Sequence, residues 1–262
     1  MHIEEIVEKI NPIDKKYVHQ AQERFDQLIK PLGSLAKLEE MTSRYAGIVE
    51  KTDKNELDYP KKMLLVWCDI QQAATVEQIM AGKLPVNVLA EETSAVVYPI
   101  VVTSDNKEDA LNEGAALVQE LVRKHAVELL GFGSLSEQSN VVSAMCGGML
   151  QAAAMKIPVV LDGKATCMAA VQAVTYTAHI KDYLFAGHVS EESGMENLLE
   201  NLGLSASLRL EISDGAGAGA AMAFTLFDAG LRAYKEMETF EEAGVHAEMK
   251  EFSLHEQKKK GQ

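Results

Sequence analysis

Six short apolar runs recur along the chain, and the segments between them place their apolar residues at helical spacing. The runs cover residues 63–68, 96–102, 127–132, 157–161, 183–187 and 207–212. Near-continuous Val, Ile and Leu, as in residues 157–161, is typical of strands that are buried on both faces. Such strands occur in parallel sheets covered by helices. The sequence therefore predicts an α/β fold with a mostly parallel sheet of about six strands and flanking helices.

The two ends of the chain differ from its middle. Residues 1–50 and the region after residue 225 have helical patterns and lie largely outside the apolar runs. We therefore expect residues 51–224 to form an α/β nucleotide-binding-like domain. Residues 1–50 and 225–262 are expected to pair into a small helical subdomain.

The charge balance argues against several classes of partner. The chain has 39 acidic and 25 basic residues, a net charge of −14, which opposes binding to nucleic acid or to an anionic membrane through a broad basic patch. No segment has the length and apolar character of a membrane span, and the first residues lack the pattern of a signal peptide. Cys68, Cys146 and Cys167 show no Cys-x-x-Cys spacing. Reduced, buried thiols in a cytoplasmic protein are expected.

Polar residues follow the ends of the predicted strands. In open parallel sheets, ligands bind beyond the carboxyl ends of the strands, so these positions are candidates for a pocket. They are Asp69, the loop from Gly131 to Ser139, Asp162 and Gly163, His188 with Ser190 and Glu191, and the turn that starts at Asp214. Helix caps and turns also use Asp, Ser and Gly, so a purely structural role stays open for each.

The turn after the last run is rich in glycine. Gly215, Gly217 and Gly219 alternate with alanine before an Ala-rich segment, an arrangement that lets backbone amides approach a ligand. The same glycines also permit close packing between a helix and a strand, and the spacing does not choose between the two roles. Asp214, at the edge of the turn, is the only carboxylate there that can accept a proton.

Five segments give the chain a resemblance to a known enzyme family. They are residues 24–35 (Arg-Phe-Asp-Gln-Leu-Ile-Lys-Pro-Leu-Gly-Ser-Leu), 86–90 (Val-Asn-Val-Leu-Ala), 158–163 (Pro-Val-Val-Leu-Asp-Gly), 187–194 (Gly-His-Val-Ser-Glu-Glu-Ser-Gly) and 236–245 (Glu-Met-Glu-Thr-Phe-Glu-Glu-Ala-Gly-Val). In this order they resemble the nicotinate-nucleotide:dimethylbenzimidazole phosphoribosyltransferases, and the resemblance spans nearly the whole chain.

The resemblance implies a Rossmann-like protein that forms a homodimer and has no metal or other cofactor. Such enzymes transfer the phosphoribosyl group of nicotinate mononucleotide to an aromatic acceptor, which makes the lower-ligand nucleotide of cobamides. A carboxylate acts as general base, and amides and cations hold the phosphate. The substrate-binding candidates are Asp69, Asn87, Asp162, Gly163, His188, Ser190, Glu191, Gly215, Gly217 and Gly219. Arg24, Lys30 and Ser34 are expected at a dimer contact or in a partner's site.

The chain departs from the family where the chemistry occurs. Alignment of the glycine turn puts Ala216 at the position of the family's proposed base, a glutamate, and Phe132 replaces a second glutamate in the phosphate loop. A segment that carries a phosphate-binding lysine in typical members is absent between Leu150 and Val159. Loss of a general base typically costs about 10²–10⁴-fold in rate, so the isolated chain is expected to be nearly inactive.

Three functions remain open from the sequence. In the first, the chain is the non-catalytic subunit of a heteromeric phosphoribosyltransferase and pairs with a full-length catalytic paralogue. A two-subunit form that uses phenol or p-cresol is known in this family. In the second, the chain is an enzyme in which Asp214, Asp162 or Glu191 replaces the base and Lys164 the missing cation. In the third, the chain binds a base or nucleotide without turning it over.

Overall fold

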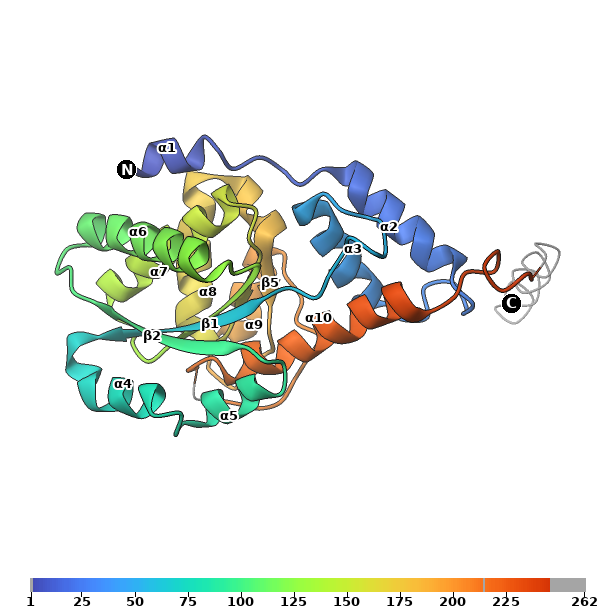
Figure 1. Cartoon of the computed structure of the whole chain (residues 1–262). Coiled ribbons are helices and arrows are strands. Elements are labelled where there is room, and N and C mark those ends of the chain that lie inside the picture. Colours follow the sequence, from blue (N-terminus) through green and yellow to red (C-terminus); the bar gives the residue numbers. More distant parts are fainter. Residues whose placement is uncertain (1, 214, 246–262) are drawn as a thin grey trace.

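The computed structural model describes residues 2–213 and 215–245 (Figure 1). Its strands are β1 (Lys62–Asp69), β2 (Val96–Val102), β3 (Leu129–Ser134), β4 (Val159–Leu161) and β5 (Leu184–Ala186). The α-helices are α1 (Ile3–Val7), α2 (Lys15–Gln27), α3 (Lys37–Val49), α4 (Ala73–Met80), α5 (Pro85–Glu91), α6 (Lys107–His125), α7 (Ser139–Ala154), α8 (Gly163–Tyr176), α9 (Met195–Leu202) and α10 (Ala218–Glu236). Two 3₁₀ helices, η1 (Ile70–Gln72) and η2 (Ala178–Tyr183), complete the described elements.

The strands form one parallel sheet in the order β2-β1-β3-β4-β5. Val66 in β1 lies between Pro99 of β2 and Gly133 of β3, and all residues of β1 and β3 are buried. This is the environment that the continuous apolar runs predict. The α/β fold with a mostly parallel sheet is therefore confirmed. The first crossover places β2 on one side of β1, and the second returns to place β3 on the other side. This arrangement creates a topological switch point between β1 and β3.

The prediction of a sixth strand at residues 207–212 is wrong. Residues 207–212 do not join the sheet and make only an isolated bridge, between Leu208 and His188. Polar and apolar residues alternate in this run, unlike the continuous apolar runs of the central strands, and Leu210 is exposed. Glu211 has a positive φ of 56°, which interrupts extended backbone. The described sheet therefore has five strands, and residues 207–212 form an extended segment beside the end of β5.

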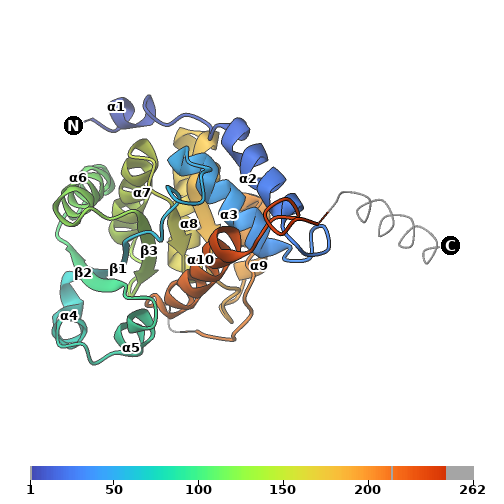
Figure 2. The ribbon, with the colours of Figure 1, turned by 45° about the vertical axis from the view of Figure 1, so that its right-hand side comes forward.

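Two layers of helices cover the sheet. Helices α6, α7 and α8 pack side by side on one face, while α5 and α10 lie on the other (Figures 1 and 2). Close contact between α6 and α7 depends on glycine, because a Cβ atom on Gly114 would lie 1.8 Å from the Ala144 carbonyl oxygen. Among the described residues, no helix is both long and apolar enough to cross a lipid bilayer.

The N-terminal helices separate into two groups. Helix α1 packs on α7, whereas α2 and α3 pack on each other and α3 also packs against α10. Arg44 of α3 joins this group to the sheet, since its guanidinium donates to the Leu184 carbonyl oxygen and stacks 3.7 Å from the centre of the Phe185 ring. Helix α10 runs without interruption through residues 224–225, where the boundary between subdomains is predicted. The division into two domains stays a prediction.

Candidate functional site

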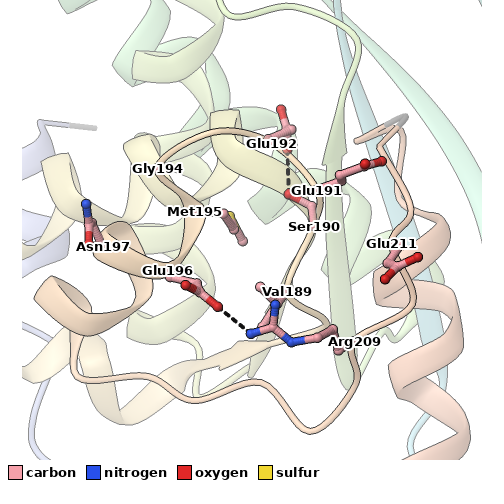
Figure 3. Close-up of a pocket in the computed structure, with 10 residues that line it drawn as sticks. All are labelled: Val189, Ser190, Glu191, Glu192, Gly194, Met195, Glu196, Asn197, Arg209 and Glu211. Carbon is pink, nitrogen blue, oxygen red and sulfur yellow. Dashed lines mark hydrogen bonds and ion pairs between the residues drawn. The ribbon is translucent and has the colours of Figure 1, made fainter.

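Two adjoining clefts open at the carboxyl ends of β3, β4 and β5. The first, which we call the α8 cleft, has a volume of about 200 Å³, and the second, the α9 cleft, about 380 Å³. The α8 cleft is lined by Ser134, Leu135, Ser136, Glu137, Asp162, Gly163, Lys164, Ala165, Glu192 and Gly215. The α9 cleft is lined by Val189, Ser190, Glu191, Glu192, Gly194, Met195, Glu196, Asn197, Arg209 and Glu211 (Figure 3). Glu192 belongs to both.

Glu192 lies at the N-terminus of α8. Its Oε2 accepts hydrogen bonds from the Lys164 backbone amide at 2.7 Å and from the Ser190 hydroxyl at 2.9 Å. A carboxylate is favourable at this position because the first amides of a helix have no partner within the helix and carry partial positive charge. Gly163 makes room for it, since a Cβ atom there would lie 3.0 Å from the same oxygen. The chain therefore supplies its own anion to the α8 N-terminus.

The α8 cleft is predominantly acidic. Glu137, Asp162 and Glu192 line it together with one cation, Lys164. The Lys164 Nζ atom lies 3.7 Å from a Glu137 carboxylate oxygen, so this cation already has a carboxylate neighbour. A phosphate group in the cleft would face more negative than positive charge at short range. The electrostatics of the cleft therefore oppose binding of a phosphate ester.

Asp162 and His188 form a buried pair behind this cleft. His188 Nδ1 lies 2.9 Å from Asp162 Oδ1, and neither side chain is exposed. On the other side of the ring, His188 Nε2 lies 3.2 Å from the Ile212 carbonyl oxygen. Burial by itself lowers the pKa of His188, but the contact with the Asp162 carboxylate and its charge outweigh burial and raise it above the ordinary value. The pair joins β4, β5 and the extended segment that precedes the glycine turn.

The glycine turn packs tightly against this pair. The Gly219 amide donates to Asp162 Oδ2 at 3.2 Å, and a Cβ atom on Gly219 would lie 1.9 Å from His188 Nδ1. Gly217 has a φ of 113°, and a Cβ atom there would lie 2.4 Å from Leu64. Both glycines are buried, so close packing accounts for them. Gly215 differs, because it lines the α8 cleft.

Ala216, which the family resemblance aligns with the proposed base, lies within the same turn. It is 4% exposed, and its backbone carbonyl carbon lies 2.3 Å from where a Cβ atom on Gly133 would stand. The backbone of the turn therefore packs tightly on β3 at this position. Asp214, the acid considered as a replacement base, lies outside the described residues.

Only some of the remaining site candidates line the two clefts. Asp69 caps η1 by accepting from the Gln71 amide at 2.7 Å. It also accepts at 3.2 Å from Gln138, which follows the lining residues of the α8 cleft. Asn87 is engaged in local structure, because its side chain bonds to the Leu84 amide and the Ile79 carbonyl. Asn87 lines neither cleft. Candidates that converge on the clefts are Asp162, Gly163, Lys164, Ser190, Glu191 and Gly215.

The N-terminal candidates lie within the helical group. Arg24 donates to the Tyr234 carbonyl at 2.9 Å and stacks over the Tyr234 ring. Lys30 forms a buried ion pair with Glu39 at 2.8 Å. Ser34 is exposed. Arg24 thus ties α2 to α10, and Lys30 ties the segment after α2 to α3.

The α9 cleft is bounded by exposed acids. Glu196 pairs with Arg209 across the cleft, while Glu191 and Glu211 lie on two neighbouring loop segments (Figure 3). Sequence reasoning selected Glu191 and missed Glu192. These neighbours point in different directions (Figure 3), and Glu192 is held toward α8 by its hydrogen bonds with the Lys164 amide and the Ser190 hydroxyl. In the part of the chain that the structure describes, no group of three or more His, Cys, Asp and Glu is arranged to hold a metal ion.

The order β2-β1-β3-β4-β5 and a cleft beyond the strand ends define a doubly wound α/β protein with the flavodoxin-like strand order. A family model described as phosphoribosyltransferase matches residues 10–106 and 139–245, and the chain belongs to this family. The matched residues leave out 107–138, which contain β3 and the Ser134–Glu137 wall of the α8 cleft.

Similar proteins carry one name. The chain is 26% identical, over 348 aligned positions, to a nicotinate-nucleotide–dimethylbenzimidazole phosphoribosyltransferase of Geotalea uraniireducens, covering 93% of this chain and 98% of that protein. It is 44% identical over 103 residues to the protein of that name in a Shewanella species, covering 39% of this chain and 29% of that protein. The crystal structure of CobT from Thermus thermophilus has the same fold, with a TM-score of 0.77 and 22% identity over 88% of this chain and 99% of that one. Since this chain has only 262 residues, the Geotalea relative contains segments that are absent here.

Proposed function

We propose that this chain is a non-catalytic subunit of a phosphoribosyltransferase that activates the lower ligand of cobamides. In the complex, a full-length catalytic paralogue transfers α-ribosyl phosphate from nicotinate mononucleotide to an aromatic base or phenol. The observation that carries the proposal is the buried methyl group of Ala216 at the position where the family resemblance places a basic glutamate. A methyl group cannot accept the proton that the attacking acceptor loses.

The charge of the α8 cleft supports the same conclusion. Glu192 occupies the N-terminus of α8, and Lys164 is next to Glu137, so the groups that favour an anion are already engaged. The relatives' names describe enzymes that act on nicotinate nucleotide, a phosphate ester. Their longer sequences supply segments that this chain lacks. A second, complete family member would restore both the base and the phosphate site.

The test compares four samples in one assay. The chain alone, a full-length paralogue alone, their mixture, and the mixture with the paralogue's turn glutamate replaced by glutamine are incubated with nicotinate mononucleotide and dimethylbenzimidazole or phenol. We expect nicotinate release from the mixture, loss of release with the glutamine variant, and a heteromeric mass by light scattering. Absence of a complex together with unchanged activity of the paralogue contradicts the proposal.

The same samples distinguish the two alternative functions. Release of nicotinate by the chain alone identifies an enzyme with a rearranged site, for which Glu137 and Glu192 in the α8 cleft and Glu191 in the α9 cleft are the available carboxylates. Saturable calorimetric binding of nicotinate mononucleotide or benzimidazole to the chain alone, without release, identifies a binding protein.

A further inference from the structure

His188 lies between two hydrogen-bond acceptors. Its Nδ1 faces the Asp162 carboxylate at 2.9 Å, and its Nε2 faces the Ile212 carbonyl at 3.2 Å. A neutral imidazole carries a hydrogen on only one ring nitrogen, so either neutral tautomer would leave an unprotonated nitrogen next to one of these oxygens. The contact between Nδ1 and Asp162 is an ion-pair contact and not a hydrogen bond, and only the imidazolium ion places an N–H group next to both oxygens. The completely buried position makes an unmatched polar contact costly, because no water is available to replace the missing donor.

Asp162 is also fully engaged in a way that requires its charge. Its Oδ2 accepts from the Gly219 amide at 3.2 Å, and its Oδ1 lies 2.9 Å from His188 Nδ1 in an ion-pair contact. A protonated carboxyl group would have to place its hydrogen toward one of these donors. The two side chains therefore complement each other as a carboxylate and an imidazolium, and each compensates the buried charge of the other.

We propose that His188 is protonated at neutral pH and acts as a latch that positions the wall of the α8 cleft. It connects the end of β5 to Asp162 at the start of α8 and, through Asp162, to Gly219 at the start of α10. Through Ile212 it fixes the segment that leads into the glycine turn. This assignment is independent of the proposed function, because it depends only on the contacts of the ring.

The surroundings keep the proton on the ring. Asp162 and Glu192 are the negative groups that act on His188, and both favour its charged form. Cys167 of α8 also lies near Asp162, and burial raises the pKa of its thiol to about 12, so it contributes no charge at neutral pH. The electrostatic environment is thus consistent with the geometry of the two acceptors.

The direct test is the nitrogen spectrum of the histidine rings. In ¹⁵N-labelled protein we expect both ring nitrogens of His188 to carry hydrogen at neutral pH, with the exposed His179 as the reference in the same spectrum. A resonance pair typical of a neutral tautomer at neutral pH would overturn the proposal. The wild-type spectrum is sufficient, so the test does not depend on the folding of any variant.

The Asp162→Asn variant tests the role of the carboxylate. The asparagine oxygen can still accept from the Gly219 amide, while its NH₂ group donates toward His188 Nδ1. The ring should then become neutral, with its hydrogen on Nε2 facing Ile212. Retention of both ring hydrogens in a folded variant contradicts the role given to Asp162.

Hydrogen exchange reports what the latch holds. The Val189 amide donates to the Leu208 carbonyl at 2.9 Å and the Glu191 amide to Ile212 at 3.4 Å. When His188 loses its proton at alkaline pH, these two amides should lose protection beyond the intrinsic acceleration of exchange. The Gly187 amide, which donates to Leu161 within the sheet, is the matched control and should follow the intrinsic trend. Equal behaviour of all three amides contradicts a latch.

Discussion

The Asp162 carboxylate lies 2.9 Å from His188 Nδ1, and both side chains are shielded from solvent at the ends of β4 and β5. Since the folded pKa of His188 is raised, its contribution to stability is complete below the unfolded pKa of about 6.5 and is lost as pH rises through the folded pKa. The free energy of unfolding in urea should therefore fall more steeply on the alkaline side for the wild type than for His188→Gln.

At pH 6, removal of the imidazolium leaves Asp162 buried without its cation, and we expect His188→Gln to cost about 3–5 kcal/mol. His179→Gln is the matched control, because this side chain is exposed, and it should change stability by less than about 0.5 kcal/mol. A constant difference between wild type and His188→Gln across pH 6–10 contradicts the predicted linkage.

Gly219→Ala should be strongly destabilising. Its new methyl group would overlap His188 Nδ1 and lie 2.5 Å from Asp162 Oδ1, so the pair or α10 must move. Overpacking of this kind typically costs about 1–3 kcal/mol or more. Gly82→Ala is the control, since Gly82 has a φ of 70° and open space around its Cβ position. The control should show only the backbone cost of about 1–2 kcal/mol. Thermal unfolding at one pH compares them, and a smaller loss for Gly219→Ala is the contrary result.

The buried Lys30–Glu39 pair should dominate the acid side of the stability profile. Burial alone raises the pKa of Glu39, but hydrogen bonds from Lys30, Gln22 and the Leu35 amide outweigh it and lower the pKa. The stability from Glu39 is therefore present above its unfolded pKa and is lost as pH falls through the folded pKa.

Lys30→Met should cost about 3–5 kcal/mol at pH 7 and flatten the acid limb, because Glu39 loses its buried partner. Lys37→Met is the matched control, since Lys37 pairs with Glu40 on the surface. The control should cost at most about 0.5 kcal/mol. Urea titrations from pH 3 to 7 measure both, and equal losses for the two variants rule out the special role of the buried pair.

Ala216→Glu should not make the isolated chain an enzyme. The new carboxylate would supply a base, but the α8 cleft would still lack a site for phosphate because Glu137 and Glu192 remain there. We expect no nicotinate release and a loss of stability above about 1 kcal/mol, since this position is buried. Ala178→Glu, at an exposed position, controls for added charge. Measurable turnover by Ala216→Glu alone would mean that the missing base was the single defect.

The three cysteines should be unreactive in the folded protein. All are buried and unpaired, and burial raises the pKa of the Cys68 thiol to about 12 and that of Cys146 as well. The thiolate is the reactive form, so labelling by a disulfide reagent at pH 8 should follow global unfolding. Rapid labelling of one thiol in native buffer would instead reveal local opening.

The sequence identifies the elements of this fold whose patterns are continuous. β2 occupies the predicted residues 96–102, and the other four strands overlap their apolar runs. In β1 and β3, burial on both faces requires apolar residues throughout. The run at 207–212 alternates instead, which is compatible with a strand but also with the extended segment observed. The local pattern alone does not distinguish a strand from such a segment, because a segment joins the sheet only where an edge strand can pair with it.

The site was predictable at the level of strand ends and not at the level of side chains. Asp162, Ser190 and Glu191 reach the clefts because they follow buried strands. The direction of Glu192 depends on its hydrogen bonds to Lys164 and Ser190, which belong to two different segments. Likewise, the residues around Gly219 in the sequence do not indicate that the ring of His188 packs against it. Such contacts arise only when distant segments are packed together.

Helix α10 starts directly after Gly217 and continues for 19 residues to Glu236. At about 1.5 Å per residue it is a stiff rod of roughly 28 Å. Its first residues pack against the Asp162–His188 pair through Gly219. Farther along the helix, a Cβ atom on Gly230 would lie 2.3 Å from the Thr42 hydroxyl of α3. The two ends of this rod cannot be displaced independently. A tilt imposed on α3 is therefore transmitted along α10 to the glycine turn, whose Gly215 lines the α8 cleft.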